Sequence, residues 1–201
     1  MQYRFSRMRS QNKDIAFAVM VGAILLGTVL GTVSFCLFPE SMTEALASSA
    51  RDYMSFRKGS DMAGILLNSF AVTSLFIASE FLLGFFALGM LPEVLVLIYR
   101  GCGLGIVLSQ AYTGCSASER VIAALMIVPA CVISCFALCL AAKEAVRLSG
   151  RLLVDLTAKE NCRGELEYLK TYLVRFLALE AIAAVSAAVD CISSLLLADR
   201  F

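Results

Sequence analysis

The sequence predicts an all-α integral membrane protein, a polytopic helical bundle of five transmembrane helices. The chain of 201 residues is 60% apolar, well above the roughly 45–50% typical of soluble domains, and its mean hydropathy is +0.83. Its 17 basic and 16 acidic residues gather in a few segments and leave long windows nearly free of charge. A spanning helix needs about 20 apolar residues. Five windows of a single membrane domain (1–201) meet this requirement: 15–38, 63–91, 94–113, 121–142 and 172–197.

The first window follows a basic N-terminal tail and so resembles a secretory signal peptide. Its 24 residues exceed the 7–15 residues of the apolar core of such a signal, and no small-x-small cleavage site ends it. We therefore expect the window to be retained as the first transmembrane helix and to serve as the targeting signal.

The second and third windows are separated by a proline. Pro92 disfavours helical backbone at the residue before it, so we expect the second helix to end at Leu91. With so short a connection, the second and third helices are predicted to form a tight hairpin.

Two polar segments lie between the windows. Segment 39–62 is predicted to form a short amphipathic helix on the outer membrane surface. Its apolar face supplies the candidate partner-binding residues Met42, Leu46, Tyr53 and Phe56. Segment 143–171 mixes leucines with six basic and five acidic residues. It is expected to be a cytoplasmic loop, either a solvated helical extension or an interfacial or partner-binding segment.

Lysines and arginines near the helix ends predict the orientation, because cytoplasmic connections are rich in both. The N-terminal tail carries four of them, segment 143–171 six and segment 39–62 three. Five spans place the two richest segments on the same side of the membrane. We therefore expect a cytoplasmic N-terminus and an external C-terminus.

The composition argues against several kinds of chemistry. The chain has no histidine and a net charge of +1, which removes the commonest general base and gives no basic face for nucleic acid. No protease, nucleotide-binding or hydrolase motif is present, so we expect no enzymatic activity, cofactor or metal. Cys131, Cys135 and Cys139 recur every four residues on one helix face. That stripe suits helix packing, with Cu(I) binding as the alternative.

Ionisable residues inside the spans are the sharpest polar feature, because each is costly in the hydrocarbon region and normally faces the bundle interior or water. They are Glu80, Arg100, Glu180 and Asp190. A turn at residues 91–92 leaves about 4.5 Å of axial offset between Glu80 and Arg100. We expect these two side chains to pair and lock the hairpin, with ion conduction or a proton relay as alternatives. Glu180 could meet Arg175 or a polar group on another helix, and Asp190 could reach water.

Glycine spacing predicts close helix packing. Gly27 and Gly31 form one Gly-x-x-x-Gly pattern, and Gly101 and Gly105 form another. Such patterns let the backbones of membrane helices approach one another closely. We therefore expect a compact bundle, and the same small-residue faces are candidates for a partner interface.

The hairpin region resembles the stage II sporulation protein M family. The segment Leu82-Leu-Gly-Phe-Phe-Ala-Leu-Gly-Met-Leu-Pro92, followed by Ile98-Tyr-Arg-Gly-Cys-Gly-Leu-Gly105 and Ile127-Val-Pro129, carries the likeness. The basic tail, the polar outer segment and the total of five helices are also similar. The residues matched are Gly89, Pro92, Arg100, Gly101, Gly105 and Pro129.

The resemblance implies a non-catalytic scaffold of the engulfment machinery in endospore formation. Such a protein recruits the peptidoglycan-degrading stage II sporulation proteins D and P in the mother-cell membrane, so membrane lipids and these two proteins are the implied partners. The alternative is an ion or small-molecule transporter or channel subunit that uses Glu80, Glu180 and Asp190 as a polar path. An intramembrane enzyme is disfavoured, because too few polar residues share a depth.

Overall fold

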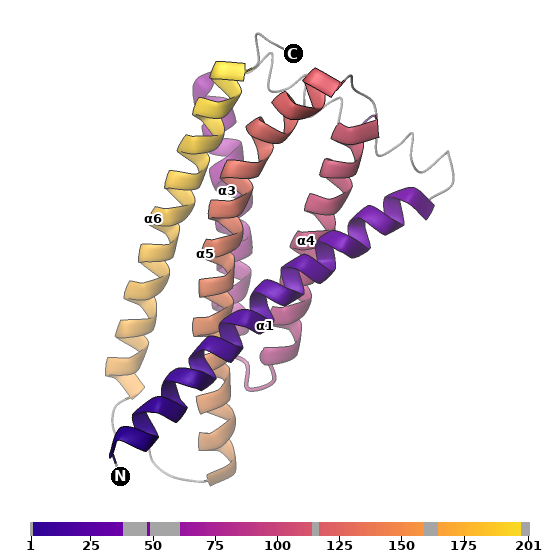
Figure 1. The fold of residues 1–201 in the computed structure, drawn as a ribbon. Coiled ribbons are helices and arrows are strands. Elements are labelled where there is room, and N and C mark those ends of the chain that lie inside the picture. The colour runs from indigo at the N-terminus through magenta and orange to yellow at the C-terminus, as the bar shows by residue number, and fades with distance from the viewer. Residues whose placement is uncertain (1, 38–47, 49–60, 114–116, 159–164, 198–201) are drawn as a thin grey trace.

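The structure is a computed structural model that describes residues 2–37, 48, 61–113, 117–158 and 165–197. Those residues contain five long helices (Figure 1), which are α1 (Gln2–Leu37), α3 (Met62–Leu83), α4 (Met90–Thr113), α5 (Ala117–Ala158) and α6 (Glu165–Leu197). Each includes a stretch long and apolar enough to cross a membrane. The predicted all-helical class is thereby confirmed, and the number of helices long and apolar enough to span a membrane matches the predicted five.

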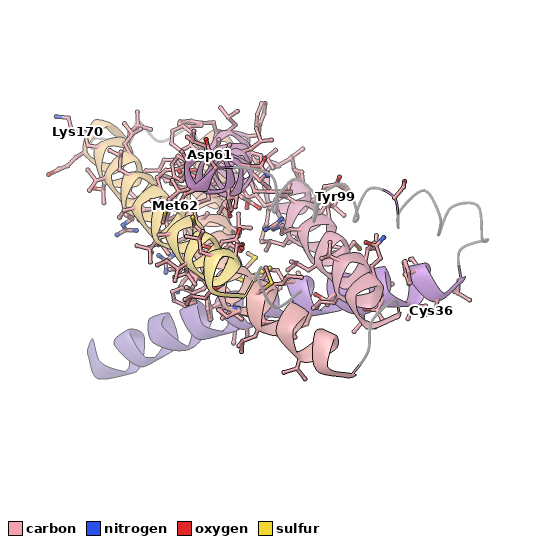
Figure 2. The ribbon with its side chains drawn as sticks, turned by 90° about the horizontal axis from the view of Figure 1, so that it is seen from above. Cys36, Asp61, Met62, Tyr99 and Lys170 are labelled. Atoms are coloured by element: carbon pink, nitrogen blue, oxygen red, sulfur yellow. The ribbon has the colours of Figure 1, made fainter. Side chains whose placement is uncertain are left out.

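Helix α5 runs through the middle of the bundle and contacts each of the other four helices. Helix α1 crosses it obliquely and packs chiefly against α4 (Figure 1). Figure 2, which looks down on the molecule, shows α1 lying along one side of the remaining helices. The start of α1 and the end of α6 lie at opposite ends of the bundle, as an odd number of spans requires.

Small residues form the centre of the bundle. Four alanines of α5 have no exposed surface, and they are Ala137, Ala141, Ala142 and Ala145. Ala183 of α6 and Leu97 of α4 are equally buried. Because short side chains keep the helix axes close together, neighbouring helices pack closely around α5.

The hairpin between α3 and α4 differs from the prediction. Helix α3 ends at Leu83 instead of Leu91, and Gly84 closes it by donating its N–H to the carbonyl oxygen of Glu80 at 3.1 Å. A turn of residues 84–89 follows, and α4 begins at Met90. Pro92 thus lies in the first turn of α4, where a backbone N–H would have no partner inside the helix. The proline opens the third helix and does not end the second.

Helices α5 and α6 extend well beyond the windows predicted for them. Helix α5 continues from residue 142 to Ala158, and α6 begins at Glu165, so most of segment 143–171 is helical extension. At 1.5 Å per residue, the 42 residues of α5 are about 63 Å long, twice the roughly 30 Å of a hydrocarbon core. Pro129 lies inside α5, and that helix bends in its first part (Figure 1), as a missing N–H allows.

Candidate functional site

Two glutamates face each other across the α3–α4 hairpin. Glu80 precedes Gly84 by four residues, and Glu93 follows Gly89 by four, so both stand at one depth beside the turn. Each is 0% exposed, and the two carboxyls are close enough to repel one another when charged. Neither has a hydrogen-bond donor among the described residues. Burying two such carboxyls in an apolar interior costs free energy. That cost is offset only if the carboxyls are protonated or if a hydrogen-bond donor reaches them from residues that the structure does not describe.

The turn between the two glutamates is held by helices α5 and α6. Ser149 of α5 donates its hydroxyl to the carbonyl oxygens of Phe86 and Ala87 at 2.7 and 3.2 Å. Tyr172 of α6 donates to the carbonyl oxygen of Phe81 at 3.0 Å. A Cβ added at Gly84 would lie 3.1 Å from the Cα of Ala145. The turn therefore needs glycine where it meets α5, and hydroxyl groups satisfy its carbonyls.

An aromatic cluster surrounds the hydrogen bond between Tyr172 and Phe81. Tyr172 stacks on Phe81 with ring centroids 5.2 Å apart, and Phe176 contacts both rings. Phe85 meets Phe81 edge-to-face at 5.1 Å. The cluster ties the end of α3 and the turn to α6.

The predicted Glu80–Arg100 pair is wrong. Arg100 lies 11 residues beyond Gly89, whereas Glu80 lies four before Gly84. The difference of seven residues is about 10.5 Å along the helices, too far for the side chains to close. The Arg100 guanidinium instead sits over the ring of Phe76, 5.2 Å from its centroid. Its Nε is buried and has no hydrogen-bond partner within the described part of the chain.

Arg100 borders a partly open cavity of about 280 Å³ between helices α3, α4, α5 and α6, and the wall of this cavity is mostly apolar. The polar side chains that line it are Asn68, Ser69, Thr73, Arg100, Ser134, Ser186 and Asp190. Several of the hydroxyls already donate to backbone, such as Ser186 to the carbonyl oxygen of Ala130 at 2.8 Å. Asp190 is 4% exposed, so it points into the bundle. Neither Glu80 nor Glu180 lines this cavity, so it does not join the three carboxylates of the predicted polar path.

Glu180 bonds across the bundle. It accepts a hydrogen bond from the hydroxyl of Ser74 on α3, which is the polar group on another helix that the sequence offered as the alternative to Arg175. Arg175 pairs instead with Glu144 of α5, which also binds Arg147. Glu180 therefore joins α3 to α6.

The two Gly-x-x-x-Gly patterns meet each other where α1 crosses α4. A Cβ on Gly27 would lie 2.9 Å from the carbonyl carbon of Ile98, and one on Gly31 would lie 2.8 Å from the Cα of Cys102. Cβ atoms on Gly101 and Gly105 would come equally close to the α1 backbone. The patterns thus fit into one another, which holds α1 against α4 with no room for a methyl group.

The predicted partner-binding residues and the cysteine stripe do not belong to these contacts. Met42, Leu46, Tyr53 and Phe56 lie outside the described residues. Among the residues that are described, no group of three or more His, Cys, Asp or Glu side chains is placed to hold a metal. Cys131, Cys135 and Cys139 line a separate groove instead.

Sequence reasoning missed Glu93, because the predicted connection between the second and third helices contained it. Its position directly after Pro92 was the available signal: proline followed by an acidic residue is typical of the first turn of a helix.

Searches against protein-family models, curated proteins and solved structures found no match to this chain.

Proposed function

We propose that this chain is a non-catalytic membrane scaffold. The resemblance at the hairpin and at the Gly101–Gly105 pattern specifies the process: engulfment during endospore formation, with the chain in the mother-cell membrane. There it recruits and assembles the peptidoglycan hydrolases of stage II, proteins D and P.

One structural observation carries the scaffold proposal: helices α5 and α6 project beyond the length that a membrane needs. Side-chain contacts brace the projection. Glu144 binds Arg147 and Arg175, and the Arg151 guanidinium lies 3.8 Å from the ring centroid of Tyr168. A rigid pair of helices outside the bilayer offers a surface that the bundle itself does not require.

The distribution of basic residues supports an orientation for the scaffold. The start of α1 and the α5–α6 projection lie at one end of the bundle (Figure 1), and both segments are rich in lysine and arginine. By the positive-inside rule this end is cytoplasmic. The end of α1 and the start of α3 then lie on the outer side (Figure 1), where peptidoglycan is degraded.

Affinity purification tests the proposal. The tagged chain, extracted in mild detergent from sporulating cells, should bring down cell-wall hydrolases that mass spectrometry identifies. An unrelated five-span protein carrying the same tag is the control. Equal recovery of hydrolases with both proteins would overturn the scaffold function.

The cavity beside Arg100 favours a second candidate, a transporter or channel subunit, because two ionisable side chains, Arg100 and Asp190, line it within the spans, and such residues mark solute pathways. Proteoliposomes containing the chain would then show a flux of ions or small solutes above that of empty liposomes. Arg100→Gln would reduce that flux. A flux at the empty-liposome level for the unaltered chain would exclude this candidate.

A further inference from the structure

The cysteine stripe of α5 forms one wall of an apolar groove, here called the α1–α5 groove, with a volume of about 350 Å³. Its other walls come from α1 and α4, and representative lining residues are Phe17, Leu25, Leu104, Val132, Cys135 and Phe136. Cysteine side chains are small, so they leave the groove wider than leucine or phenylalanine would. The three cysteines therefore widen the groove, which is an effect beyond close helix packing.

The groove presents no polar group that needs a partner. Thr28 contributes the hydroxyl group of the α1 wall, and this hydroxyl donates to the carbonyl oxygen of Ile24 at 2.9 Å. Leu25 and Val132 on its rim are 61% and 62% exposed, so the groove opens to the hydrocarbon region. Its contents must themselves be apolar, because a polar group here would lose its hydrogen bonds.

A positive charge stands at one end of the groove. Lys143 follows Cys139 by four residues and so continues the cysteine stripe on the same face of α5. Its ammonium lies 5.5 Å from the ring centroid of Phe17, which in turn meets Phe136 edge-to-face at 6.1 Å. Unlike Arg147, Lys143 has no carboxylate partner among the described residues. Its charge is therefore available to an anion at the end of the groove.

We propose that the α1–α5 groove binds one acyl chain of an anionic phospholipid, whose phosphate headgroup lies at Lys143. The groove is too small to hold a further spanning helix, which is about 10 Å or more across, whereas a hydrocarbon chain fits a narrow apolar channel open to the bilayer. The adjoining lysine then selects an anionic headgroup over a zwitterionic one. The basic end of the bundle places that headgroup in the leaflet assigned above to the cytoplasmic side.

Tryptophan fluorescence provides the test, because the chain has no tryptophan of its own. Phe136→Trp places a single indole in the groove, and Leu75→Trp places one on α3, where Leu75 is 71% exposed. Each variant is reconstituted in phosphatidylcholine vesicles and quenched with dibrominated phosphatidylglycerol or dibrominated phosphatidylcholine. Phe136→Trp should show about a fivefold preference for the anionic lipid, the ratio expected for one lysine at an anionic surface. Leu75→Trp should show no preference.

Substitution of the lysine separates a specific site from general attraction to the basic end of the bundle. Adding Lys143→Gln to Phe136→Trp should abolish the preference, whereas adding Lys170→Gln, on α6 outside the groove (Figure 2), should leave it intact. Equal quenching by the two lipids at Phe136→Trp, or a preference that survives Lys143→Gln, would overturn the proposal. Protection from both quenchers would do so too, since protein would then fill the groove. Val132→Trp is the second reporter if Phe136→Trp does not fold.

Discussion

Gly31 of α1 lies directly against the backbone of Cys102 in α4, so close that an added Cβ would stand 2.8 Å from the Cα of Cys102. Neither backbone can move without separating the two helices along their crossing. Gly31→Ala should therefore lower the free energy of unfolding by about 1–3 kcal/mol, as overpacking does. Thermal unfolding in detergent measures this change.

The matched controls for Gly31→Ala are glycines of the same two helices that have open space around them. A Cβ on Gly22 of α1 or Gly103 of α4 meets nothing within 4 Å. Alanine at either position should leave stability unchanged or raise it by up to about 1 kcal/mol through helix propensity. Equal losses at Gly31 and Gly103 would show that the crossing is not where the structure places it.

Ser149 is predicted to hold the hairpin turn. Ser149→Ala removes the hydroxyl that serves the carbonyls of Phe86 and Ala87, which should cost about 1–3 kcal/mol of stability. Ser79→Ala is the control, because Ser79 donates to Phe76 within its own helix and its loss should cost below about 0.5 kcal/mol. Proteolysis near the turn, compared between the two variants, should rise only for Ser149→Ala.

Replacing Glu80 or Glu93 by glutamine should not destabilise the protein. Glu80→Gln and Glu93→Gln remove from the interior two carboxyls that have no donor in the part of the chain that the structure describes. Stability should therefore stay unchanged or rise by about 1 kcal/mol, and hydrolase recovery should not change. Glu180→Leu provides the contrast, since it leaves the Ser74 hydroxyl without its acceptor and should cost about 1 kcal/mol or more. A loss above about 2 kcal/mol for either glutamine variant would mean that the carboxylate is charged and paired.

The proposed orientation predicts where the C-terminus lies. Alkaline phosphatase fused after Phe201 should be active and green fluorescent protein at the same position should be dark, because only the first of these works outside the cytoplasm. Fusions after residue 160 should give the opposite result. The reverse pattern would place the basic end of the bundle outside, against the positive-inside rule.

The sequence was sufficient for the number of helices, because hydropathy depends on composition within a window. It was not sufficient for the helix ends. Residues 84–91 are apolar whether they form helix or turn, so the end of α3 at Leu83 is set by contacts of the turn with Ser149 and Ala145. Because α3 ends at Leu83 and not at Leu91, Arg100 lies far from Glu80, and Glu93 lies opposite Glu80 instead.

Glycine spacing likewise predicted that helix backbones approach one another closely, but it did not identify which helices meet. The pattern at Gly27 and Gly31 could have met any small-residue face in the bundle, and only the crossing angle of α1 selects α4. The Ser74–Glu180 bond is similar, because residues 106 positions apart become neighbours through the order in which helices pack. Sequence reasoning named Glu180 and left its partner open.

The most direct test of the scaffold function is the recovery of hydrolases with an altered outer segment. A variant carrying Met42→Ser, Leu46→Ser, Tyr53→Ser and Phe56→Ser keeps the length of segment 39–62 and removes the apolar face that the sequence predicts for it. Hydrolase recovery should fall about tenfold or more relative to the unaltered chain, as loss of a binding hot spot predicts. Leu75→Ala, on a lipid-facing position, should not change it. Equal recovery with the four-serine variant, or no hydrolase with the unaltered chain, would contradict the account.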